Sequence, residues 1–123
     1  TYNVRTLRPF NNSTANRVEF VLGLLEDAVQ LNFCAFAKAA SASNFGIGIG
    51  LDSTTADDPL VVKNAGGSTT GDGLTAGYSG LPAQAGYHYL QLLEIAASAV
   101  TTTYYGNRDL ELEQSGASGF VMA

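Results

Sequence analysis

The chain has 123 residues, of which 46% are hydrophobic and only 14% are charged, so we expect one folded domain rather than a disordered chain. The formal net charge is −5, and the six basic residues are scattered without forming a patch, which argues against nucleic-acid binding. No charge-free apolar run reaches membrane-spanning length, no signal peptide is visible at the N-terminus, and a single cysteine excludes a disulfide scaffold.

The dominant pattern along the chain is an alternation of apolar and other residues with period two, which predicts short β-strands. In chain order, the alternation runs through residues 18–22, 29–38, 45–51 and 110–113. A Thr- and Tyr-rich segment at residues 100–105 also has the composition of a strand. Short strands at fairly even spacing are typical of a β-sandwich or a barrel.

Three segments are less regular. Residues 35–42 are rich in alanine, and residues 87–99 carry apolar residues at both helical and strand spacing. We favour strands for both, because the second segment lacks a good N-cap and continues with β-branched and aromatic residues, while a helix over residues 90–99 stays open. Residues 65–86 carry seven glycines and predict a long loop, which contains at most a short strand at residues 74–78.

Two clusters of turn-type residues invite a functional interpretation. The run GIGIG at residues 46–50 lacks the spacing of a nucleotide-binding loop, so we favour a strand whose glycine face admits another backbone or an aromatic side chain. Asp52, Asp57 and Asp58 lie close together, and clustered carboxylates can hold calcium. Their spacing does not match a calcium-binding loop, so acidic turn residues that cap a strand are the preferred interpretation.

The residues that could support catalysis are few. His88 is the single histidine, and no nucleophile motif surrounds Cys34 or the serines. Cys34 lies among apolar neighbours and is expected to be a buried, inert thiol. Glu111 and Glu113 share one face of a strand, which is typical of a solvent-facing strand rather than of a glycosidase pair. We therefore expect no enzyme activity, no metal site and no cofactor.

Tyrosines gather in the C-terminal half of the chain, at Tyr78, Tyr87, Tyr89, Tyr104 and Tyr105. Aromatic side chains in or beside exposed loops can form a surface that binds sugars or proteins. Packing in the core and at subunit interfaces is the preferred interpretation.

Three motifs resemble a pattern in virion proteins of tailed bacteriophages. They are GIGIGLDSTTA at residues 46–56, GYHYLQLLE at residues 86–94 and TTTYYG at residues 101–106. The same motifs, in the same order, recur in fibre, spike and head-decoration proteins of different phages. The resemblance therefore points to a structural module rather than to one protein.

The resemblance implies an all-β fold, an antiparallel jelly-roll β-sandwich of about eight strands that assembles as a homotrimer. Residues 11–123 would form this single jelly-roll domain, and residues 1–10 would form an N-terminal arm. The candidates for the trimer interface are Tyr87, Tyr89, Tyr105, Phe120 and Val121. Two basic residues of the arm, Arg5 and Arg8, are candidates for contacts with acidic residues of a capsid protein.

The expected function is that of a bacteriophage virion structural protein, either a trimeric capsid decoration protein or a head-fibre module, assembled in the host cytoplasm. Its expected partners are copies of itself and the major capsid protein or another virion protein. A low share of charge agrees with this role, because surfaces buried between protein chains are depleted in charged residues. The alternative is a receptor-binding domain of a fibre or spike that recognises a host surface glycan. A small hydrolase and a signalling ligand of the tumour-necrosis-factor type have less support, since neither a catalytic constellation nor a secretion segment is visible.

Overall fold

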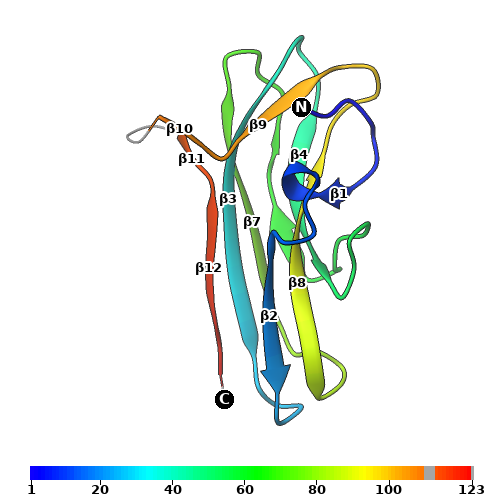
Figure 1. Cartoon of the computed structure of the whole chain (residues 1–123), viewed down its shortest axis with the longest axis vertical. Coiled ribbons are helices and arrows are strands. Elements are labelled where there is room, and N and C mark those ends of the chain that lie inside the picture. The colour runs from blue at the N-terminus through cyan, green and yellow to red at the C-terminus, as the bar shows by residue number, and fades with distance from the viewer. Residues whose placement is uncertain (110–112, 123) are drawn as a thin grey trace.

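The computed structural model describes residues 1–109 and 113–122, and two antiparallel β-sheets pack face to face in it (Figure 1). Twelve strands and one three-residue 3-10 helix lie in these residues. The prediction of an all-β antiparallel sandwich is therefore confirmed. Within the same ranges, no helix has both the length and the apolar character needed to cross a membrane.

The first sheet is built around its longest strand, β8, and is called the β8 sheet below. Its strands are β1 (Arg8–Pro9), β2 (Arg17–Leu22), β4 (Phe45–Leu51), β6 (Ala65–Gly66) and β8 (Gly86–Ile95). Strand β4 pairs with one edge of β8 and carries β6 on its far side. Strands β1 and β2 pair one after the other with the opposite edge of β8, and the helix η1 (Phe10–Asn12) lies between them in the chain.

The second sheet is built around β3 and is called the β3 sheet. Its strands are β3 (Val29–Ala39), β5 (Val61–Lys63), β7 (Asp72–Gly80), β9 (Thr102–Tyr105) and β12 (Gly116–Val121). Strand β7 pairs with one edge of β3 and with β5 beyond it, while β12 and β9 pair with β3 at successive positions. A separate two-stranded ribbon consists of β10 (Asn107–Asp109) and β11 (Glu113–Gln114).

The strand pairs are nested in the way that defines a jelly roll. Strand β2 pairs with β8, β3 with β7, and β4 with β6, so that each inner pair is enclosed by the next one in the sequence. The chain thus wraps as a folded-over hairpin, and successive pairs alternate between the two sheets. This topology is the expected fold class, and the short strands β1, β9, β10 and β11 are additions to it.

The core lies between the two sheets and follows the period-two pattern of the sequence. In β3, every second side chain from Val29 to Ala37 is buried, and Ile47 and Ile49 of β4 face them from the other sheet. Residues 35–39 and 87–95 belong to strands, which confirms the choice of strand over helix for both segments.

The glycines of β4 admit a close approach by the chain that follows them. A Cβ atom at Gly50 would lie 2.6 Å from the carbonyl oxygen of Ala56 and closer still to that of Ser53. Only glycine therefore fits at this position, because the β4–β5 loop crosses directly over it. The predicted close approach of another backbone to the glycine face is confirmed here.

Two predictions about individual segments are wrong. Residues 65–86 were expected to form a long loop, with a short strand at residues 74–78 left open; a strand does form there, but β7 has nine residues and pairs with β3 over its whole length. Its inward residues Leu74, Ala76 and Tyr78 are buried, and the alternation was hidden because Gly, Thr and Ser occupy the outward positions. Cys34 was expected to be buried but is exposed, because it falls on the outward face of β3.

Residues 1–10 also depart from the expected arm. They lie along the sandwich: Tyr2 forms a bridge with Thr102, β1 joins the β8 sheet, and Phe10 is buried in the core. Figure 1 shows this segment folded against the strands rather than extended from them. The alternation predicted at residues 110–113, with Glu111 and Glu113, falls outside the described side chains.

Candidate functional site

The five candidates for the trimer interface do not share one surface. Tyr87 and Tyr89 point outward from the β8 sheet, and Tyr87 is 56% exposed. Tyr105 and Phe120 point outward from the β3 sheet, on the other side of the sandwich, and Phe120 is 54% exposed. Val121 is half-buried and packs against the core. The structure therefore separates these residues into two groups that one flat contact cannot cover together.

The outward side of the β3 sheet is unusually poor in charge. Side chains that lie opposite one another in the strand register share a face, so the pairing places the exposed residues of β12, β3, β7 and β5 together. We call this surface the charge-poor face, and its members are Gln30, Asn32, Cys34, Val62, Thr75, Ser79, Ser118 and Phe120. None of these eight side chains is charged, although Lys38, farther along β3 on the same side, lies over the ring of Tyr105. The solvated face of an antiparallel sheet is usually polar, so two exposed apolar residues among eight uncharged ones set this surface apart.

A groove borders this face where the sandwich is open along one side. Strands β2 and β12 are the edge strands there, and the cavity between them has a volume of about 260 Å³. Val18, Phe20, Phe120 and Val121 are among its lining residues. The apolar side chains of β2 and β12 are thus accessible from this side.

The two basic candidates of the N-terminal segment have different surroundings. Arg8 donates from Nε to Oε1 of Glu94 over 2.7 Å, and its guanidinium lies 3.8 Å from the centre of the Tyr2 ring. Arg5 is exposed and lies at the rim of a cavity. Of the two, only Arg5 presents a guanidinium that is not already paired with a carboxylate among the described residues.

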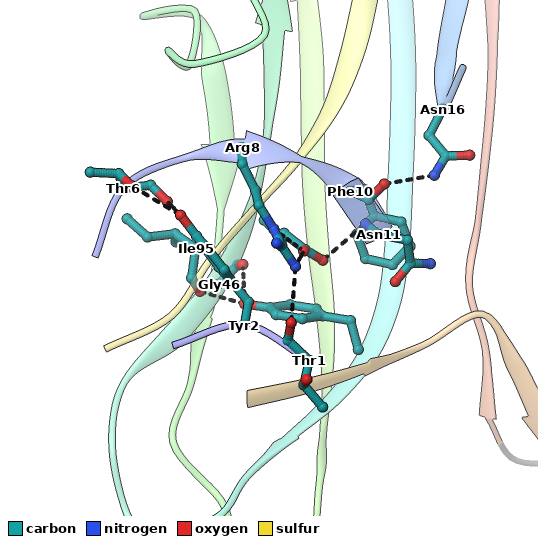
Figure 2. Close-up of polar contacts among 11 residues, drawn as sticks. Thr1, Tyr2, Thr6, Arg8, Phe10, Asn11, Asn16, Gly46 and Ile95 are labelled. Carbon is teal, nitrogen blue, oxygen red and sulfur yellow. Dashed lines mark hydrogen bonds and ion pairs between the residues drawn. The ribbon is translucent and has the colours of Figure 1, made fainter. Parts of the chain in front are cut away.

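Glu94 is the group that holds this region together, through hydrogen bonds from Arg8 and from the backbone of Asn11, the two partners labelled in Figure 2. Its side chain is only 1% exposed, and its second oxygen, Oε2, accepts a hydrogen bond of 3.1 Å from the backbone N–H of Asn11. Glu94 is a structural residue to which none of the sequence motifs above assigns a role. A carboxylate inside the apolar run LQLLEI was the available signal, because a buried charge needs a partner.

Backbone hydrogen bonds fix the first residues of the chain against the segment that follows β8. The pairs are Tyr2 with Thr102, Asn3 with Ala99, and Val4 with Ala96. The hydroxyl of Tyr2 donates to the carbonyl of Thr6 over 2.8 Å. Arg5 therefore lies between two anchored neighbours and forms part of a fixed wall.

The cavity beside Arg5 has a volume of about 180 Å³ and opens on the outward side of the β8 sheet. Gly46, Ile95 and Ala97 contribute its apolar surface, and Asn44 and Lys63 contribute polar groups. The amino group of Lys63 is ion-paired with Asp57.

Tyr104 supports this cavity from the opposite sheet. Its buried hydroxyl contacts the carbonyl oxygens of Gly46, over 2.9 Å, and of Ile95. Burial strongly raises the pKa of the Tyr104 phenol, and the nearby negative charge of Glu94 raises it further, so the hydroxyl keeps its proton and donates. The backbone of the cavity floor is thus held by a side chain of β9.

His88 occupies a second polar cluster, at the opposite end of β8. Its Nδ1 lies 2.6 Å from Oδ2 of Asp52, and its Nε2 lies 2.7 Å from the carbonyl oxygen of Gln84. The hydrogen bond to Asp52 raises the pKa of His88, although partial burial opposes this shift. Both ring nitrogens face acceptors, so the arrangement suits the doubly protonated ring and links two loops.

The residues considered for catalysis or calcium binding are used otherwise. Cys34 lies on the outward side of the β3 sheet and is not brought to His88. Asp52 and Asp57 each accept a backbone N–H, from Tyr89 and Ile49 respectively, which confirms their interpretation as capping residues. Asp58 does the same for Leu60. Among the described residues, no group of three or more His, Cys, Asp or Glu side chains is arranged to hold a metal ion.

Comparison with protein-family models, with curated proteins and with solved structures finds no match for this chain.

Proposed function

We propose that this chain is a structural protein of a tailed-phage virion, a capsid decoration or head-fibre module that assembles as a homotrimer through the charge-poor face. The phage assignment is supported by the motifs at residues 46–56, 86–94 and 101–106. The assembly is supported above all by the absence of charge on an exposed sheet face of eight described residues.

The edge strand β12 strengthens the case for assembly. Edge strands offer unpaired N–H and C=O groups to other chains, and monomeric proteins protect them with charged residues, proline or bulges. Residues 116–121 read GASGFV, with no charge and no proline, and β12 runs without a bulge against β3. An unprotected edge of this kind is expected where a neighbouring chain covers it.

Phe120 links the edge to the face and to the groove. It is exposed in the single chain, lines the groove between β2 and β12, and lies opposite Gln30 on the charge-poor face. Interface cores are enriched in aromatic residues and depleted in charged ones. Phe120 is therefore the proposed centre of the contact, and Tyr87, on the other sheet, is proposed to lie outside it.

The proposed further partner is the major capsid protein or another virion protein. Of the two basic candidates for this contact, Arg8 is already paired with Glu94, and only Arg5 has no carboxylate partner among the described residues. The proposed location of the protein is the virion.

The experiment is a comparison of two aspartate variants by light scattering after size exclusion. Phe120→Asp and Tyr87→Asp place the same charge at two aromatic positions of nearly equal exposure, one on each sheet. The wild type and Tyr87→Asp should have the mass of three chains, and Phe120→Asp should have the mass of one.

Cys34 provides an independent readout, because it is exposed on the charge-poor face, where it pairs with Gly116, four residues before Phe120. Its thiol should react slowly with a thiol reagent in the wild-type trimer and rapidly in Phe120→Asp. A wild-type monomer, or a trimer in which Cys34 reacts as fast as in Phe120→Asp, would rule out assembly through this face.

A second function, recognition of a host surface glycan, is favoured by a different observation. The cavity beside Arg5 combines an apolar floor with polar groups that converge on its rim, as binding sites for small ligands do. The two functions are compatible, since most of the cavity lining comes from β4, residues 95–97 and the N-terminal residues, whereas the charge-poor face is the outward side of the β3 sheet.

A further inference from the structure

We propose that the cavity beside Arg5 binds the carboxylate-bearing ring of an acidic sugar, with Arg5 as the carboxylate ligand. The proposal rests on the second function above and names its ligand class. The cavity lies between the N-terminal residues, β4, residues 63–65 and residues 95–97, so four parts of the chain contribute to it.

The charge of Arg5 is the first argument. The other cations with described surroundings have partners within the chain: Arg8 pairs with Glu94, Arg17 with Glu19, and Lys63 with Asp57. Lys38 lies over the ring of Tyr105. Arg5 has no such partner among the described side chains, in a chain whose net charge is −5. A guanidinium left unpaired at a cavity rim favours a carboxylate ligand, which it can bind through two parallel hydrogen bonds.

The anchoring of Arg5 is the second argument. The carbonyl of Val4 accepts a hydrogen bond of 3.3 Å from the N–H of Ala96, and Thr6 accepts one from the hydroxyl of Tyr2. The ion pair of Arg8 with Glu94 secures the chain two residues later. The backbone that carries Arg5 is thus fixed on both sides, which lowers the entropy lost when a ligand binds.

The floor of the cavity is the third argument. Three alternate glycines of β4 face outward, and the β4–β5 loop fills the space over two of them, Gly48 and Gly50. At Gly46, a Cβ atom would meet nothing closer than the side chain of Ile95 at 3.6 Å, which is an ordinary contact. Gly46 is buried, yet packing within the chain leaves room for a Cβ atom there, so glycine at this position keeps the floor low for a ring that lies over the strand.

The remaining lining selects a sugar over an acidic side chain of a protein. Asn44 is exposed at the rim, and its amide has no hydrogen-bond partner among the described residues, so it can serve hydroxyl groups. Ile95 and Ala97 offer an apolar surface to the C–H groups of a ring. The volume of about 180 Å³ is below the range of about 300–1,000 Å³ for drug-sized ligands, so the cavity holds one ring.

The experiment is an NMR titration of the whole chain with glucuronate at constant ionic strength, with glucose and the α-amide of N-acetylglutamate, whose one charge is its side-chain carboxylate, as matched ligands. Glucuronate should shift the amide signals of residues 44–46 and 95–97 with a dissociation constant in the millimolar range, and the other two should bind at least about tenfold more weakly.

Two pairs of variants test the residues. Arg5→Gln should weaken glucuronate binding at least about tenfold, because it removes the charged hydrogen bonds, while Lys38→Gln removes the same charge from the other sheet and should change nothing. Gly46→Ala should weaken binding several-fold by raising the floor, and Gly73→Ala, on the outward side of β7 with open space around it, should not.

The outcomes separate the proposal from the function on which it rests. Equal binding of glucose and glucuronate, or binding that Arg5→Gln leaves unchanged, would overturn the carboxylate site but not glycan recognition. Preferential binding of the N-acetylglutamate amide would assign the cavity to an acidic protein segment instead. If neither an acidic nor a neutral sugar binds, both the site and the second function are wrong, and assembly through the charge-poor face is unaffected.

Discussion

The carboxylate of Glu94 lies almost wholly inside the sandwich, and Arg8, 86 residues earlier in the chain, neutralises it at 2.6 Å. The pair joins the N-terminal segment to the central strand of the β8 sheet. The 24% exposure of the Arg8 side chain leaves its guanidinium in contact with water, whereas the 1% exposure of Glu94 leaves its carboxylate dependent on Arg8 and on the N–H of Asn11.

Removal of Arg8 alone should therefore destabilise the chain. We expect Arg8→Met to lower the free energy of unfolding by roughly 2–3 kcal/mol, because it leaves a buried carboxylate with one hydrogen bond. The loss would be larger if both partners of the ion pair were fully buried. The double variant Arg8→Met with Glu94→Leu should recover most of the loss, since no buried charge then remains. Urea unfolding of the two single variants and the double variant measures this coupling. Additive losses would show that the two residues do not depend on each other.

Tyr104 joins the two sheets through a hydroxyl that reaches the carbonyls of Gly46 and Ile95. Tyr104→Phe keeps the ring packing against Phe10 and Phe45 but removes the donor. We expect a loss of about 1–2 kcal/mol in the free energy of unfolding, because two carbonyl groups at a buried position lose their partner. Urea unfolding measures the loss, and Tyr89→Phe, on the outward face of β8, is the control. A similar loss in both variants would contradict the specific role of the Tyr104 hydroxyl.

The sequence predicted the strands that alternate clearly and missed those that do not. Apolar residues alternate with polar ones along residues 29–38, and β3 forms there as expected. Strand β7 has the same alternation of inward residues, but its outward positions are Gly73, Thr75, Gly77 and Ser79, which are also typical of loops. The composition of β7 favours a strand only weakly, and its pairing with β3 on one side and with β5 on the other stabilises it. Such tertiary support is not visible in local composition.

The candidate site was harder to predict because it depends on contacts between distant segments. Arg5 and Arg8 were chosen together as basic residues of an arm, and nothing local distinguishes them. The two residues differ because Arg8 forms an ion pair with Glu94, whereas Arg5 lies unpaired at the cavity. A charged residue inside an apolar strand predicts that some cation must come to it, but the sequence does not identify which one.

The stability of the chain should depend on pH through His88. The pKa of His88 is raised in the folded chain above its ordinary value of 6.5, mainly by the hydrogen bond to Asp52, so folding favours the protonated ring. The stabilisation is therefore complete below about pH 6.5 and is lost as the pH rises through the pKa of the folded chain. Urea unfolding between about pH 5.5 and 8 should show the wild type losing stability relative to His88→Gln as the pH rises.

Asp52→Asn tests the cause of this pH dependence. It removes the negative charge that raises the pKa of His88 and should shrink the difference between low and high pH. A wild-type stability that rises with pH in this window, relative to His88→Gln, would show that the ring is neutral in the folded chain.

Gly46 and Gly50, two of the three alternate glycines of β4, should respond differently to the same substitution. Gly50→Ala should lower the free energy of unfolding by roughly 1–3 kcal/mol, because its Cβ atom would lie 2.6 Å from the backbone oxygen of Ala56 and the β4–β5 loop would have to move. Gly46→Ala should change stability by less than about 0.5 kcal/mol, since the nearest atom, Cγ2 of Ile95, is 3.6 Å away.

Urea unfolding of the two alanine variants at one pH measures the contrast, and Gly73→Ala, with nothing near its Cβ position, sets the baseline for glycine replacement in a strand. If Gly46→Ala were as destabilised as Gly50→Ala, the lack of a side chain at position 46 would be a packing requirement of the fold. A nearly unchanged Gly46→Ala would instead leave ligand access as the reason for glycine at the cavity floor, and it would qualify this variant for the sugar titration.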